Sequence, residues 1–325
     1  MNDTGSWKMP PPGARSNKPM PPGIVFTLAL LASAGFALLF PSPFLRWGSF
    51  ELKTLVVPLL QVIMFAMGTR VSLSGLRQVV VTPKPIALGI GLQYLVMPFV
   101  AAGLAGLFQL PPEVGAGVVL VGSVCAGNSS NVMTFFAGGN MALSVAMTTI
   151  STLLAPLATP TLMRLLVHRD VPLEFGALAA SILRIVVVPV IAGLICERLL
   201  RRRKGLVDHW LPRLVITATC MVNAIITANS RQALLSIGLT LIVVELLHNF
   251  IGYGVGYTGA RLSGCNKRDA ATMAMQVGIR NAGLATGLAY DVLRSGPAAL
   301  AGVVFGTVQN ASGALLASFF RKRIG

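Results

Sequence analysis

The chain has 325 residues, of which 54% are apolar and only 11% are charged. Soluble globular proteins carry about 25% charged residues, so this composition excludes an ordinary soluble fold and indicates a chain solvated by a lipid bilayer. The net charge of +16 comes from 26 Lys and Arg against 10 Asp and Glu. In so apolar a chain we interpret it as a cytoplasmic excess of cations beside membrane spans, not as a nucleic-acid-binding surface.

Residues 1–22 contain six prolines and few aliphatic side chains, a composition that predicts a disordered cytoplasmic arm. A hydrocarbon core requires about 20 apolar residues per helix. Ten segments approach or exceed that length: 24–40, 54–69, 86–108, 114–137, 141–167, 176–198, 211–228, 233–260, 270–292 and 297–320. Their uniform apolarity argues against the alternating strands of a membrane β-barrel. The predicted fold class is an all-α membrane protein with ten transmembrane helices.

A short loop at 168–175, expected outside the cell, divides these segments into two sets of five. The half at 176–320 must then enter the membrane with the opposite orientation to the half at 23–167, which is the arrangement of inverted-repeat transporters. Counting Lys and Arg beside the segments gives 18 on one side and 6 on the other. The side rich in cations is cytoplasmic. We therefore expect both termini, including the tail 321–325, in the cytoplasm of a plasma membrane of the bacterial inner-membrane type.

Glycine and short polar residues interrupt the fourth and ninth segments near mid-depth. The interruptions read Cys125-Ala126-Gly127-Asn128-Ser129-Ser130-Asn131 and Gly278-Ile279-Arg280-Asn281-Ala282-Gly283. Small residues can serve close helix packing alone. Interruptions in corresponding places of opposed halves favour a paired binding site, because broken helices offer N-terminal ends to anions and freed carbonyls to a hard cation such as sodium.

At these residues the sequence resembles the bile acid:sodium symporter family, of the bacterial homologue type. The similarity covers about 24–320 and is carried by 130–134, 139–146, 151–156, 247–253, 281–285 and 310–313. The resemblance implies a panel domain of helices one, two, six and seven that rocks against a core domain of the other six. Broken helices four and nine would cross within that core.

The resemblance also implies two sodium sites, and both are altered in this sequence. The first would be formed by Ser130, Asn131, Ser144, Thr148 and a glutamate whose position holds Gln276. The second would be formed by Gln93, by backbone around Gln276, Val277 and Ile279, and by a glutamine whose position holds Arg280. A glutamine lacks the negative charge that compensates for lost hydration, and a guanidinium repels a cation at close range. We expect at least the second site to be unusable for sodium, and no other cofactor.

Arg280 would cost roughly 2.5–3.5 kcal/mol at the centre of a membrane helix, so it should face the bundle interior and find a partner. Glu245 is the one acid deep within a predicted span, and His248 follows it on the same helix face. Three alternatives stay open at this point. Glu245 is a static counter-ion of Arg280, or it carries a proton during transport, or it reaches solvent and pairs with neither.

The sequence thus predicts a secondary transporter of a small or amphipathic organic anion, working by alternating access and not as an enzyme. Its substrate would contact Asn131, Asn281, Arg280 and Asn310. The family spans steroid conjugates, pantoate-like acids and other organic anions. Sodium-independent or proton-linked transport is expected. Residual sodium:organic anion symport is the alternative, and a non-transporting sensor or pore on the same fold is a further one. Besides substrate and lipid, no obligate protein partner is inferred.

Overall fold

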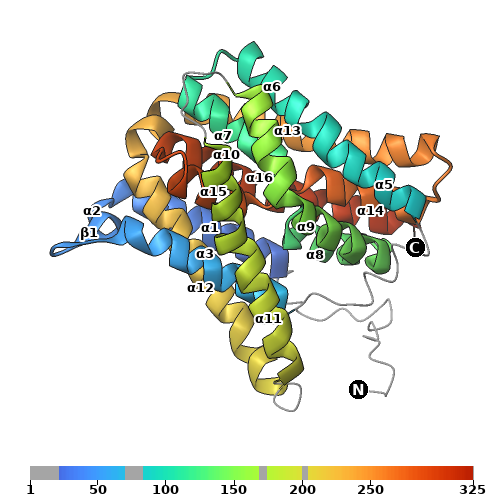
Figure 1. Ribbon diagram of the computed structural model, residues 1–325, viewed down its shortest axis with the longest axis horizontal. Helices are drawn as coiled ribbons and strands as arrows, with labels where there is room; N and C mark the ends of the chain where they lie inside the picture. Colours follow the sequence, from blue (N-terminus) through green and yellow to red (C-terminus); the bar gives the residue numbers. More distant parts are fainter. Residues whose placement is uncertain (1–21, 70–82, 168–173, 200–203, 325) are drawn as a thin grey trace.

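The computed structural model describes residues 22–69, 83–167, 174–199 and 204–324, and nearly all of them are helical (Figure 1). The predicted arm, apart from Pro22, lies outside the described residues, as do 168–173 of the predicted outer loop. Helices occur at every range where the apolar pattern predicts one. Within the described residues, five helical stretches are long and apolar enough to cross a membrane, and shorter apolar helices accompany them.

The described part of the first half of the chain is mainly helical, with a small pair of strands between its first two long helices. Its elements are α1 (Pro22–Leu39), α2 (Ser42–Leu45), β1 (Arg46–Trp47), β2 (Phe50–Glu51), the 3-10 turn η1 (Leu52–Leu55), α3 (Val56–Gly68), α5 (Pro83–Gly91), the π-helix η2 (Leu92–Val96), α6 (Met97–Leu107), α7 (Pro112–Ser123), α8 (Asn128–Phe136) and α9 (Met141–Leu166). Strands β1 and β2 pair antiparallel.

The second half is helical throughout the residues described. Its elements are α10 (Phe175–Ile182), the π-helix η3 (Leu183–Val187), α11 (Val188–Leu199), α12 (Lys204–Asn229), α13 (Arg231–Leu262), α14 (Lys267–Gly278), α15 (Ala282–Asp291) and α16 (Gly296–Ile324). The residues 321–324 of the predicted tail continue α16 as helix. Three cations in this last turn favour the helix, because its C-terminal end carries partial negative charge.

The helices pack in two groups (Figure 1). In the first, which we call the α3 group, α1 packs on α12, and α3 packs on both α11 and α12. In the second, the crossing group, α7 packs on α6 and α16, while α14 and α15 pack on α13 and α16 respectively. The main apolar core runs through both groups, because buried side chains of α3, α7, α15 and α16 belong to one cluster.

Helices α7/α8 and α14/α15 are the two interrupted helices, and their unwound segments cross. The backbone N–H of Asn281 donates to the carbonyl of Cys125 at 2.9 Å, and Ala126 pairs with Arg280 as an isolated antiparallel bridge. The sequence prediction of two breaks near mid-helix is therefore confirmed at 124–127 and 279–281. Asn281 also restarts its helix, because its side chain accepts a hydrogen bond from the N–H of Leu284.

Gly127 lies where the two unwound segments approach most closely. A Cβ atom on Gly127 would stand 2.7 Å from the carbonyl oxygen of Arg280, too close for any neighbour except a mobile side chain. The absence of a side chain at this position therefore lets the two broken helices cross.

We predict that Gly127→Ala lowers the thermal unfolding temperature of the purified protein, because overpacking of this kind costs about 1–3 kcal/mol. Gly103→Ala in α6 is the matched control, since a Cβ there meets nothing within 4 Å. The control should unfold at or slightly above the wild-type temperature. Equal unfolding temperatures for Gly127→Ala and wild type would contradict the close crossing.

Candidate functional site

Four polar side chains meet beside the crossing and form what we call the amide cluster: Asn131, Ser144, Thr148 and Gln276. The Oδ1 atom of Asn131 accepts from the hydroxyl of Ser144 at 2.6 Å and from that of Thr148 at 3.1 Å. The Nε2 atom of Gln276 donates to Asn131 Oδ1 at 3.1 Å and to Ser144 Oγ at 2.6 Å. The amide nitrogen of Gln276 thus lies among the oxygens that a cation would need.

Ser130 is the member of the predicted first sodium site that does not join this cluster. Its hydroxyl donates to the carbonyl of Gly127 at 2.6 Å, one turn back along the chain. Thr134 takes part instead, since its hydroxyl lies 3.2 Å from that of Ser144. Within the amide cluster, the oxygens of Asn131 and Ser144 each accept from a donor of this chain, and no carboxylate is a member of the cluster.

Arg280 lies at the predicted second sodium site and is completely buried. Its Nη2 atom donates to the carbonyl of Gln93 at 2.7 Å, and Nη1 donates to the carbonyl of Val124 at 3.3 Å. The side chain of Gln93 donates to the carbonyl of Gln276 at 3.0 Å. The guanidinium therefore connects η2 to the unwound segment after α7, on backbone oxygens of the kind that coordinate sodium.

Proline explains why the Gln93 carbonyl is free to accept. In η2 the N–H of Met97 bonds to the carbonyl of Leu92, five residues earlier, and the next donor in that register would belong to Pro98. Proline has no N–H, so the carbonyl of Gln93 has no partner within its helix. The same pattern recurs in η3, where Pro189 leaves the carbonyl of Arg184 to accept from Gln61 at 3.3 Å.

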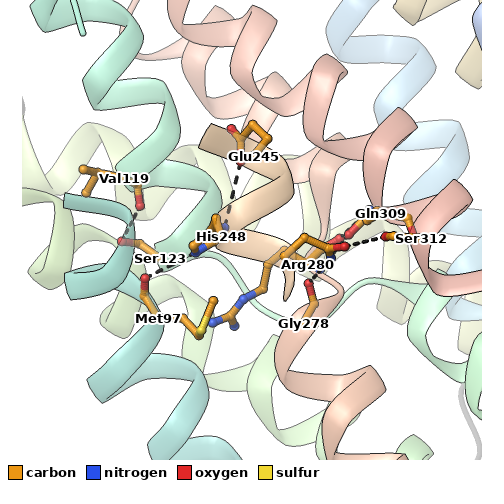
Figure 2. Close-up of polar contacts among 10 residues, drawn as sticks. Met97, Val119, Ser123, Glu245, His248, Gly278, Arg280, Gln309 and Ser312 are labelled. Atoms are coloured by element: carbon orange, nitrogen blue, oxygen red, sulfur yellow. Dashed lines mark hydrogen bonds and ion pairs between the residues drawn. The ribbon is translucent and has the colours of Figure 1, made fainter. Parts of the chain in front are cut away.

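The side chain of Gln309 in α16 forms hydrogen bonds with the unwound backbone at Arg280 (Figure 2). Its Oε1 accepts from the N–H of Arg280 at 2.8 Å, and its Nε2 donates to the carbonyl of Arg280 at 3.0 Å. Asn249 of α13 donates to the carbonyl of Gly278 at 2.8 Å. Gln309 was not among the residues predicted from the sequence. Its position directly before Asn310, within an apolar helix, is the pattern that could have indicated a role for it.

Glu245 does not pair with Arg280, which corrects the expectation of a direct counter-ion. Glu245 and His248 are both fully buried on α13, with Nδ1 of His248 3.9 Å from Oε2 of Glu245. His248 lies between Glu245 and Arg280 in Figure 2. Arg280 acts electrostatically on His248, one helical turn from Glu245, and no ion pair joins Arg280 to Glu245 itself. The alternative that Glu245 reaches solvent is also wrong for this conformation.

The remaining predicted substrate residues are mostly buried. Asn281 and Asn310 are each 5% exposed, while Asn131 is half-buried. The amide of Asn310 donates within α16 to Gly306 at 2.7 Å. An open groove of about 810 Å³ lies elsewhere, between α3 and α10–α11, lined by Gln61, Phe65, Arg184 and apolar neighbours. None of the predicted substrate residues lines this groove.

Apolar spanning helices and two interrupted helices that cross through polar residues define a class of protein, the secondary transporters. Comparisons with known proteins agree. The model of the sodium bile acid symporter family matches residues 57–246. The chain is 38% identical over 306 residues to the "uncharacterized sodium-dependent transporter YocS" of Bacillus subtilis, covering 93% of this chain and 92% of that protein.

Plant relatives give the same result. The chain is 33% identical over 289 residues to the "probable sodium/metabolite cotransporter BASS6, chloroplastic" of Arabidopsis thaliana, covering 85% of this chain and 70% of that protein. It is 30% identical over 263 residues to the corresponding BASS1 protein of the same plant, with coverages of 81% and 66%. The chain belongs to the sodium bile acid symporter family, and it is a membrane transporter rather than an enzyme.

We predict that Gln309→Leu destabilises the protein, because it leaves the buried N–H of Arg280 unpaired at a cost of about 1–3 kcal/mol, while the carbonyl of Arg280 keeps its bond from the N–H of Ala282. Thermal unfolding of the purified protein measures the effect. Gln61→Leu is the control, since Gln61 is half-buried and makes one long bond to a backbone carbonyl. If both variants lost the same small amount of stability, Gln309 would not hold the unwound segment.

Proposed function

We propose that this protein transports a small or amphipathic organic anion by alternating access without using sodium. The observation that carries the proposal is the location of Gln276 and Arg280. At each of the two positions where the family resemblance implies sodium, a nitrogen donor of this chain already lies against the oxygens.

Charge supports the same conclusion at both positions. In the amide cluster, a neutral amide replaces the expected carboxylate, so bound sodium would lack a negative partner within a buried, largely desolvated site. Beside Gln93, the guanidinium carries a permanent positive charge within hydrogen-bonding distance of the backbone of a residue that the resemblance assigns to the second site. A second cation there would meet strong like-charge repulsion at low dielectric.

For the architecture we propose ten transmembrane helices in two inverted repeats, 23–167 and 176–320, with the α3 group as panel domain and the crossing group as core. The packing of α1, α3, α11 and α12 on one another supports this division. The cation count supports cytoplasmic termini in a bacterial inner membrane.

Alternating access would require the two groups to move apart on one side at a time. One contact between them is suited to such a step. Arg184 of η3 donates to Asp291 at the end of α15 at 2.6 Å, and Ser181 of α10 donates to the same oxygen at 2.6 Å. The Arg184 side chain is 60% exposed, so this ion pair can open at little cost in free energy.

Residual sodium symport is the second candidate function, because specific observations favour it. The relatives carry "sodium-dependent" and "sodium/metabolite cotransporter" in their names, and Asn131, Ser144 and Thr148 keep the oxygen ligands of the first site. The Oε1 atom of Gln276 lies 3.2 Å from the hydroxyl of Thr148, so this side chain adds an amide oxygen to that site. The two candidates differ in whether sodium binds at all.

We predict that replacing choline chloride by sodium chloride leaves the unfolding temperature of the purified wild-type protein unchanged at constant ionic strength. The double variant Gln276→Glu with Arg280→Gln should gain a saturable stabilisation by sodium, because ligand binding to the folded state alone raises its stability. The control is Gln109→Glu with Arg184→Gln, which makes the same chemical changes at exposed positions.

A saturable stabilisation of the wild type by sodium would refute sodium independence and favour residual symport. The transport claim has its own test in proteoliposomes, with labelled steroid conjugates and pantoate-like acids supplied in choline buffer. Flux that saturates and is stimulated by substrate on the far side identifies a transporter. Flux without saturation would indicate a pore, and no flux of any of these anions would favour a sensor.

A further inference from the structure

Glu245 lies in the middle of α13 with neither carboxyl oxygen in a hydrogen bond to any described residue. The side chain is fully buried, and the Nδ1 atom of His248 beside it is equally without a partner. These two groups face each other at 3.9 Å (Figure 2). A buried carboxyl group and a buried imidazole nitrogen without hydrogen-bond partners need an explanation, because such atoms cost free energy unless they bind something.

The hydrogen-bond geometry fixes which atom of His248 holds its hydrogen. The Nε2 atom lies 3.3 Å from the carbonyl of Met97, and a carbonyl can only accept, so Nε2 carries the N–H. Nδ1 then presents a lone pair towards Glu245. If Glu245 were ionised, its carboxylate oxygen and the Nδ1 atom of His248 would both be hydrogen-bond acceptors. They would face each other with no hydrogen atom between them. One proton added to the carboxyl group would give the pair a donor and an acceptor.

We infer that Glu245 and His248 form a proton-binding site that exchanges its proton during the transport cycle. Uptake from water forms an O–H bond on Glu245, directed at Nδ1 of His248, and removes one negative charge from the buried cluster. Release returns the proton to water and restores the carboxylate. The ligand of this site is the proton itself. Its coupling to substrate movement rests on the proposed function, but proton binding does not.

The helices packed around this pair present few other charged groups. Arg280 lies close enough to His248 to act on it electrostatically. The titratable side chains on the neighbouring elements are Tyr94 in η2, Lys84 at the start of α5, Glu113 at the far end of α7, Cys125 in the unwound segment, Arg213 and Cys220 in α12, Lys267, Arg268 and Asp269 in the first turn of α14, and Arg321, Lys322 and Arg323 at the end of α16. Tyr94 donates to the carbonyl of Ser151 at 2.6 Å. The described part of α6 has none.

Arg280 gives proton binding a consequence for anion binding. With Glu245 ionised, carboxylate and guanidinium sum to zero; with Glu245 protonated, the buried cluster carries a charge of +1. An organic anion near the crossing would offset that charge. Proton and anion therefore favour each other's binding by a reciprocal coupling free energy, which is the thermodynamic condition for symport.

Infrared difference spectroscopy of the purified wild-type protein tests the site without any substrate. A protonated carboxylic acid has a C=O stretch separate from the carboxylate bands, and it shifts in heavy water. We expect a C=O band that disappears reversibly as pH rises across the range in which the protein stays folded. That band should be absent from Glu245→Gln.

The control variant is Glu51→Gln in the exposed hairpin. Lys53 lies 2.7 Å from the Glu51 carboxyl, and its hydrogen bond and positive charge lower the pKa of that group. This acid stays ionised to lower pH than an unpaired glutamate, and its removal leaves Glu245 in place, so the band should persist in Glu51→Gln.

Two results would overturn the inference. One is a wild-type spectrum without a C=O band that depends on Glu245 at any pH. The other is a Glu245 band that never titrates, which would identify a permanently protonated structural acid. Either result leaves sodium independence untouched, because the sodium stabilisation test does not involve Glu245. If Glu245→Gln lost its fold, Glu245→Asp in the same measurement should show a titrating band with a changed midpoint, and its absence would count against the site.

Discussion

The burial of one guanidinium where two broken helices cross is the constraint on which the rest of this structure depends. Among the described residues no acid forms an ion pair with Arg280, which is held by the carbonyl oxygens of Gln93 and Val124. Those carbonyls are available because Pro98 cannot donate within η2 and because the chain unwinds after α7. Gln309 fixes the backbone that carries the guanidinium. The sequence, the local backbone geometry and the hydrogen bonds thus all hold the guanidinium of Arg280 at the crossing of the two broken helices.

A fixed positive charge changes which ions the core can use. Sodium symport in this fold would need mobile cations to enter and leave oxygen sites, and here nitrogen donors of Gln276 and Arg280 lie against those oxygens. With a permanent cation in place, a variable charge must come from elsewhere. Glu245 and His248 supply the one buried acid–imidazole pair among the described residues. In the proposed cycle, this pair supplies the variable charge.

Much of the helical arrangement could be predicted from the sequence, because long apolar runs have few other stable structures in lipid. The two breaks were visible as glycine and asparagine clusters, and the meeting of Asn131, Ser144, Thr148 and Gln276 followed from the family resemblance. Of the alternatives considered for Glu245, the direct ion pair with Arg280 is not formed. Identifying an acid within a span does not give its distance to a residue on another helix, and the group nearest to Glu245 proved to be His248 on its own helix. The π-helices and the role of Gln309 depend on tertiary contacts that no local pattern reports.

The central claim is that this chain's own side chains occupy both cation positions. A crystal structure with sodium replaced by thallium tests it most directly, because thallium is a monovalent cation whose anomalous signal locates it without reference to the surrounding density. Our account predicts side-chain density for Gln276 and Arg280 at these positions and no anomalous peak among Asn131, Ser144 and Thr148 or beside Gln93. An anomalous peak among Asn131, Ser144 and Thr148 would contradict it. A peak beside Gln93, with Arg280 turned away from that residue, would also contradict it.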